Sequence, residues 1–207
     1  MSRKNIKISK PRKNTYAIVV DGETEVWYFQ MLKRNEPSLQ VNIEPKIPQK
    51  KKLPDQYKKV CELSEDYTKV FWVIDLDVII AESKNIELKK YLKSFEKEKF
   101  KNVITIFNNP CLEFWFLLHF MQTTKYFPKC KEAEKQLTKQ KEFKDYKKTQ
   151  KYFTKQDNDI YLKLKPRLSI ALINTKRTKR GNLEEIERGI CEMNLFFETE
   201  QIKNILD

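Results

Sequence analysis

Short apolar runs that alternate with helix-like segments constrain the N-terminal part of this chain more than any other feature. The strongest runs are residues 16–20, 69–74 and 102–107, and a weaker run at 41–47 contains a proline that favours a sheet edge. β-branched and aromatic residues fill the strong runs continuously, which is typical of strands buried on both faces. Helix-like segments follow the four runs at 24–34, 55–67, 83–100 and 112–121. This order predicts an α/β fold, with an open, mostly parallel sheet flanked by helices.

The rest of the chain has a different pattern. Strand-like runs disappear after about residue 122, and the segments 131–151, 158–174 and 182–205 have helical periods. We therefore predict a helical extension over residues 122–207, packed on a core at residues 15–121. Residues 1–14 contain several basic residues and no acid, which predicts a flexible cationic arm.

The charge of the chain favours a polyanionic partner. Its formal net charge is +13, and a field of this sign attracts nucleic acid. A lysine-rich surface, common in some proteomes, explains the same charge equally well. The densest basic cluster comprises Lys163, Lys165, Arg167, Lys176, Arg177, Lys179 and Arg180. We predict that this cluster binds nucleic-acid phosphates, and that Lys163 or Lys165 stabilises charge on a scissile phosphate; a solvated lysine face is the alternative.

The cysteines and the hydropathy pattern indicate a cytoplasmic protein. Cys61, Cys111, Cys130 and Cys191 are widely separated, and His119 is the single histidine, so no zinc-site spacing occurs. We expect reduced cysteines that act as small hydrophobic residues. No signal peptide is apparent, and the most apolar run is too short to span a bilayer, so no membrane association is expected.

Acidic residues follow three of the predicted strands at the point where each strand ends. Asp21 follows the first strand, with Glu25 one helical turn later; Asp75 and Asp77 follow the third, and Glu113 lies just past the fourth. Because the carboxyl ends of parallel strands meet at one edge of a sheet, we expect these five carboxylates to converge. The two-residue spacing of Asp75 and Asp77 would direct both side chains the same way in an extended chain. Such a cluster predicts an Mg²⁺ (or Mn²⁺) site.

The acidic motifs resemble those of a known family. The order strand–D/E-G-x-x-E–helix, then strand–D-x-D, is similar to the Toprim domain of topoisomerases, primases and old-family overcoming-lysogenization nucleases. More closely, residues 20–25 (VDGETE), 73–77 (VIDLD) and 107–120 (FNNPCLEFWFLLHF) resemble the three motifs of RloB-like proteins. The resemblance covers residues 15–120 firmly and the helical part only loosely, through Tyr161 to Lys165.

The resemblance implies a Toprim-like fold, Mg²⁺ dependence and a role in prokaryotic antiviral or abortive-infection defence. It also implies a nuclease that cuts nucleic acid, with transfer RNA among the targets, and an AAA/ABC-type ATPase partner protein. By motif, Glu25, Asp75 and Asp77 are expected to bind the metal, and Glu113 to bind it or to orient water. Asp21 stands where the family usually has a glutamate that acts as general acid or base, and its shorter side chain sets the carboxylate about 1.5 Å further back.

Several alternatives stay open. His119 is expected to be a packed histidine bonded to a backbone carbonyl rather than a catalytic acid. A non-catalytic subunit that binds nucleic acid or regulates an ATPase, and a nucleotide receptor, would use the same acidic cleft. The sequence contains no Walker A or G-x-G-x-x-G motif, so we expect no ATP hydrolysis. RNA and DNA substrates, and a monomer or homodimer, are not distinguished.

Overall fold

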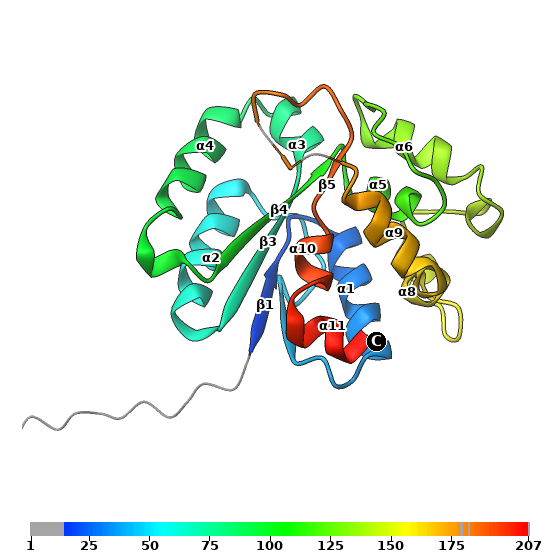
Figure 1. Ribbon diagram of the computed structural model, residues 1–207, viewed down its shortest axis with the longest axis horizontal. Helices are drawn as coiled ribbons and strands as arrows, with labels where there is room; N and C mark the ends of the chain where they lie inside the picture. The colour runs from blue at the N-terminus through cyan, green and yellow to red at the C-terminus, as the bar shows by residue number, and fades with distance from the viewer. Residues whose placement is uncertain (1–14, 179, 182, 207) are drawn as a thin grey trace, which may run out of the picture.

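A five-stranded sheet organises the protein (Figure 1). The computed structural model describes residues 15–178, 180–181 and 183–206; the predicted basic arm at 1–14 lies outside these residues. The strands lie in the order β2-β1-β3-β4-β5. Their bounds are β1 (Tyr16–Val19), β2 (Val41–Glu44), β3 (Lys69–Asp75), β4 (Val103–Asn109) and β5 (Ile190–Cys191). Strands β1 to β4 are mutually parallel, which confirms the predicted α/β fold.

The helices are short and numerous. The first group comprises α1 (Glu23–Asn35), α2 (Leu53–Asp66), α3 (Leu76–Ala81), α4 (Asn85–Ser94) and α5 (Leu112–Leu118). The second comprises α6 (Cys130–Leu137), α7 (Gln150–Phe153), α8 (Ile160–Leu164), α9 (Leu168–Thr175), α10 (Asn194–Phe197) and α11 (Glu200–Leu206). Three 3-10 turns occur at η1 (Glu98–Phe100), η2 (Lys141–Phe143) and η3 (Lys165–Arg167).

Helices cover both faces of the sheet. Helices α2, α3 and α4 lie on one face, and α1, α5 and the C-terminal helices lie on the other (Figure 1). Alternate residues of one strand serve the two layers: Val70 and Trp72 pack toward α2, whereas Phe71 and Val73 pack toward α1. This double burial explains why the strand sequences are continuously apolar.

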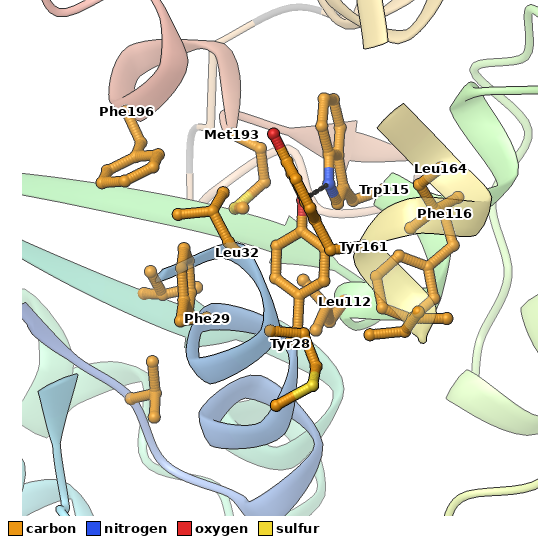
Figure 2. Packing of buried hydrophobic residues seen from close by; sticks show 14 of the residues in the cluster. Tyr28, Phe29, Leu32, Leu112, Trp115, Phe116, Tyr161, Leu164, Met193 and Phe196 are labelled. Carbon is orange, nitrogen blue, oxygen red and sulfur yellow. Dashed lines mark hydrogen bonds between the residues drawn. The ribbon is translucent and has the colours of Figure 1, made fainter. Parts of the chain in front are cut away.

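The larger core lies between α1, α5 and the C-terminal helices. Tyr28 of α1, Trp115 of α5 and Tyr161 of α8 meet there (Figure 2), and Trp115 Nε1 donates a hydrogen bond to the Tyr28 hydroxyl at 2.9 Å. Phe196 of α10 packs edge-on against Phe29 with 5.5 Å between ring centroids. The C-terminal helices therefore share one hydrophobic core with the sheet.

Some elements differ from the sequence predictions. The expectation that no strand follows residue 122 is wrong, because β5 pairs antiparallel with Asn108 and Asn109 of β4. Asp77 does not continue an extended chain, because α3 begins directly after Asp75. Gly22 is the N-cap of α1. Edge strand β2 ends before a cis peptide bond at Pro45, consistent with the predicted sheet edge.

Candidate metal centre

Asp21 and Glu25 lie in the tight connection between β1 and α1. β1 ends at Val19, Asp21 follows two residues later, and Glu25 lies in the first turn of α1. A Cβ at Gly22 would lie 2.6 Å from Glu25 Oε2, so a side chain at this position would displace the Glu25 carboxylate. The short D-G-x-x-E spacing thus directs the Glu25 carboxylate back over the strand end.

Asp75 is the last residue of β3 and lies beside Asn108 in the register of β3 and β4. Its Oδ2 accepts the backbone N–H of Leu112 at 3.2 Å, and its Oδ1 lies 3.4 Å from Asn108 Nδ2. The carboxylate therefore links the end of β3 to the beginning of α5. This link places the helix that carries Glu113 beside the centre.

Asp21, Glu25 and Asp75 form the tightest acidic group. Each offers one carboxylate oxygen, and the three oxygens lie within 4.8 Å of one another. Glu25 and Asp75 are buried, whereas Asp21 is partly exposed. The expected convergence of strand-end acids is thus found for these three residues.

Asp77 lies beside this group, in the first turn of α3. Its backbone N–H donates to the Pro110 carbonyl at 3.1 Å, and its Oδ2 accepts the backbone N–H of Cys130 at 3.1 Å. One carboxylate oxygen of Asp77 is therefore used to hold the beginning of α6. Burial raises the pKa of Asp77, although this hydrogen bond acts in the opposite direction.

Glu113 is completely buried in the first turn of α5 and has its own set of partners. Its Oε1 accepts a hydrogen bond from the Tyr146 hydroxyl at 2.6 Å and lies 3.0 Å from Lys148 Nζ. Lys148 also lies 3.0 Å from Glu134 Oε1. Burial alone would lower the pKa of Lys148, but Glu113 and Glu134 outweigh it and raise that pKa above its usual value. The negative charge of the Glu113 carboxylate is thus balanced by the Lys148 ammonium group.

The pKa values of the three carboxyl groups in the centre are all raised. Burial raises the pKa of Glu25 to about 8, with further contributions from the Asp21 and Glu113 carboxylates. Burial and the charge of Asp77 raise the pKa of Asp21 to about 6. The pKa of Asp75 is also raised, by burial first and then by Glu25 and Asp21. The shared cause is that these groups are buried beside like charges.

The donor set fits a hard divalent cation. Carboxylate and amide oxygens are the ligands that Mg²⁺ and Mn²⁺ prefer. The Asn108 side-chain oxygen is buried next to Asp75 and, among the described residues, has no hydrogen-bond partner. A cation would reduce the repulsion among the acids. Asp21, Glu25 and Asp75 can together hold a metal ion.

The expectation of uniformly reduced cysteines is wrong for one pair. Cys111 and Cys130 form a disulfide with 5.5 Å between their Cα atoms, whereas Cys61 and Cys191 are free. The bridge links the residue before α5 to the first residue of α6, and Cys130 Sγ lies 2.9 Å from Glu113 Oε2. Because the sulfurs are bonded to each other, they offer no thiolate to a metal beside Glu113.

The residues of the predicted basic cluster have contacts of their own. Lys163 donates to the Tyr152 hydroxyl at 3.0 Å, and Lys165 pairs with Glu36 at 2.6 Å. The other contacts are Arg167 with Glu142, Lys176 with Glu198, Arg177 with Gln122 and Arg180 with Glu192. Lys179 lies outside the described residues. Within the described part of the chain, none of these cations contacts the five acids.

Three residues of the centre were not predicted as site residues from the sequence. Tyr146 and Lys148 lie in a Lys/Glu-rich stretch without a distinctive motif, and nothing local separates Lys148 from Lys147. Asn108 lies in the N-N-P segment after the fourth predicted strand, a segment that could either direct amide groups at the site or cap the following helix. Its position at the end of a strand, opposite Asp75, was the one available signal.

His119 is a packed residue, as predicted. Its Nδ1 lies 3.0 Å from the Trp115 carbonyl, and the ring packs edge-on against Trp115. Burial lowers the pKa of His119 to about 3. The imidazole is therefore neutral near pH 7 and separate from the acidic group.

None of the helices in the described part of the chain has the length and hydropathy of a membrane span.

Comparisons with known proteins place the chain in a family. Searches of curated proteins and of solved structures found no match. The family model described as RloB-like protein matches residues 16–199, a range that includes all five acids. The motif resemblance is therefore confirmed, and the chain belongs to the RloB-like protein family.

Proposed function

We propose that the protein is a metal-dependent nuclease of Toprim type, with Mg²⁺ or Mn²⁺ at the acidic centre. The observation that carries this proposal is the convergence of Asp21, Glu25 and Asp75 oxygens within 4.8 Å. When bound, a hard divalent cation supplies electrophilic stabilisation of the negative charge that develops on a phosphoryl group. Family membership supports the proposal, since the same three motifs carry the acids.

The chain's own residues have separate tasks in this proposal. Glu25 and Asp75 hold the cation, and Asp21, which is more exposed, holds it directly or through water. Asp77 and Glu113 organise the surroundings, because each has an oxygen committed to a protein donor. Lys148, which lies beside Glu113, is the cation available to contact a phosphate that enters the centre. This residue takes the role that the sequence assigned to Lys163 or Lys165.

The proposed substrate is nucleic acid, either RNA, with transfer RNA among the candidates, or DNA. The net charge of +13 supports a polyanionic substrate. The family resemblance supports a role in antiviral or abortive-infection defence beside an AAA/ABC-type ATPase partner. In this role, the protein is the effector that cuts nucleic acid, and the ATPase partner controls its activity.

The decisive experiment compares cleavage by the native chain and by Asp75→Ala. Purified protein is incubated with tRNA, single-stranded RNA and plasmid DNA, with Mg²⁺, with Mn²⁺ and with EDTA. We expect metal-dependent cleavage that Asp75→Ala abolishes. Asp66→Ala is the matched control, because Asp66 is an exposed acid at the last residue of α2.

Two outcomes would contradict the proposal. Cleavage that continues in EDTA, or that Asp75→Ala leaves unchanged, would show that the acidic centre is not the active site. Nucleic-acid binding without cleavage of any substrate, also after addition of the ATPase partner, would instead favour the non-catalytic subunit.

A further inference from the structure

Three consecutive lysines, Lys50, Lys51 and Lys52, lie between β2 and α2 and border the acidic centre. The backbone N–H of Lys51 donates to the Asp21 carbonyl at 2.7 Å. The lysine segment is therefore hydrogen-bonded to the same turn that carries Asp21 and Gly22. Residues 50–52 were not part of the basic cluster predicted from the sequence.

The segment is also held from the interior of the sheet. Gln56 Nε2 donates to the Lys51 carbonyl at 2.9 Å, and Gln56 Oε1 accepts from Trp72 Nε1 at 2.8 Å. Trp72 is completely buried in β3, and Gln56 is buried beside it. These contacts fix the backbone of the segment without using a lysine side chain. The backbone from which the three lysine side chains project is thereby fixed before any ligand binds.

A cavity of about 480 Å³ joins the lysines to the acids. Its lining includes Asp21, Asp75, residues 50–52, Glu82 and Lys84. This volume is within the range of small-ligand pockets, so it accommodates a nucleotide unit. A second cavity of about 540 Å³ shares Lys51 and Gln56 with the first, so the two adjoin along the lysine segment.

The lysines outnumber the carboxylates that could neutralise them. Glu82 lies 3.3 Å from Lys50 Nζ and 2.5 Å from Lys84 Nζ, so one carboxylate serves two cations. Over the described ranges, neither Lys51 nor Lys52 forms an ion pair with a carboxylate. Like charges on consecutive residues repel each other, and a bound anion would relieve that repulsion.

We propose that residues 50–52 form a phosphate-binding subsite for a nucleic-acid strand, beside the phosphate that is cut at the acidic centre. The identity of the ligand rests on the proposed function. Lysines that contact phosphates position a strand without reading its sequence. By contrast, Lys165, Lys176 and Arg180 of the predicted basic cluster are already paired with carboxylates.

The test is a comparison of two triple variants that each remove three positive charges. The first is Lys50→Gln/Lys51→Gln/Lys52→Gln, and the matched control is Lys176→Gln/Arg177→Gln/Arg180→Gln. Binding of fluorescein-labelled single-stranded RNA, and of DNA of the same sequence, is measured by anisotropy. Ca²⁺ occupies the centre during the measurement because it has the same preference for oxygen ligands. A separate Mn²⁺ titration shows whether the acidic centre is intact.

We expect the first variant to bind RNA or DNA about 10- to 100-fold more weakly. The slope of log affinity against log salt concentration should be smaller by about two, because each lost phosphate contact on a single strand removes about 0.7. The control should bind within about twofold of the native chain, because a general loss of charge far from the ligand has little effect. Mn²⁺ affinity should be unchanged in both. Lys51→Gln/Lys52→Gln, which keeps the Lys50–Glu82 pair, replaces the triple variant if that variant does not fold.

Equal weakening by both variants would overturn the inference, as would a first variant that binds like the native chain or a native chain that binds neither strand. These results are separable from the nuclease claim. A chain that cuts normally without Lys50 to Lys52 retains the proposed function and loses this subsite. A chain that never cuts, yet loses binding only in the first variant, retains the subsite and loses the nuclease.

Discussion

Lys148 Nζ lies 3.0 Å from Glu113 Oε1, so the acidic centre contains a cation from the chain itself. Glu113 is completely buried, whereas the Lys148 side chain is 38% exposed. The pair therefore has one end in the protein interior and one end accessible to a ligand. Under the proposed function, Lys148 would contact an incoming phosphate and also balance the charge of Glu113.

Lys148→Gln should reduce both stability and nuclease activity. Loss of the ammonium leaves Glu113 buried with Tyr146 as its remaining hydrogen-bond donor. The cost should be below the about 3–5 kcal/mol typical of fully buried pairs, because Lys148 is partly in water. Cleavage should be about 10²-fold slower, as for other lost charge-stabilising donors. Urea unfolding and initial cleavage rates measure the two effects; Lys147→Gln, the exposed neighbour, is the control and should change neither.

Without metal, the protein should lose stability as pH rises from about 4.5 to about 8. The pKa of Glu25 is raised to about 8 by burial, Asp21 and Glu113, so the folded state binds more protons than the unfolded state in this window. Stability therefore falls with rising pH. Thermal unfolding in EDTA at pH 5, 6.5 and 8 tests this sign against Glu25→Gln, which should flatten the dependence. Addition of Mn²⁺ at pH 8 should restore the stability of the native chain, and a Tm that ignores Mn²⁺ would argue against a metal centre.

Gly22→Ala should weaken metal binding without removing a charge. The new Cβ would lie 2.6 Å from Glu25 Oε2, so this carboxylate has to move within a buried site. Changes to residues that orient a metal ligand typically lower metal affinity about 10- to 100-fold. Isothermal titration with Mn²⁺ measures the effect. Thr24→Ala in the same helical turn is the control; equal affinities for the two variants would show that Glu25 does not contact the metal.

Reduction of Cys111–Cys130 should lower the free energy of unfolding. The two cysteines are separated by 19 residues, and a bridge over a loop of this length typically contributes about 3 kcal/mol. Urea unfolding with and without a dithiol reductant should show the loss in the native chain. Cys130→Ser should be insensitive to the reductant, whereas Cys61→Ser, which removes a free cysteine, should respond like the native chain. An unchanged midpoint in the native chain would mean that the bridge adds no stability.

The parts of the site that follow strand ends could be predicted from the sequence. Continuous apolar runs identify buried parallel strands, and the topology then brings Asp21, Glu25 and Asp75 together. The position of Asp77 could not be predicted, because a two-residue spacing fits an extended chain as well as the first turn of a helix. The residues after it, Val78 to Ala81, are apolar and helical, but too few to show a period.

The contributions of the C-terminal half were not predictable for a different reason. Tyr146 and Lys148 reach Glu113 through tertiary packing, and β5 is only two residues long. Cys111 and Cys130 meet because α6 packs on α5, a contact that sequence spacing does not report. Such long-range contacts depend on the whole core, whereas strand ends are marked locally.

The two edge strands of the sheet, β2 and β5, are short, which bears on the association of one copy of the chain with another. A sheet edge with unpaired N–H and C=O groups can template strand addition by another chain. Here β2 is only four residues long and is followed by Pro45, which lacks an N–H. At the other edge, two-residue β5 runs antiparallel to its neighbour and covers the end of β4. We expect these short edges to disfavour strand addition by another copy of the chain.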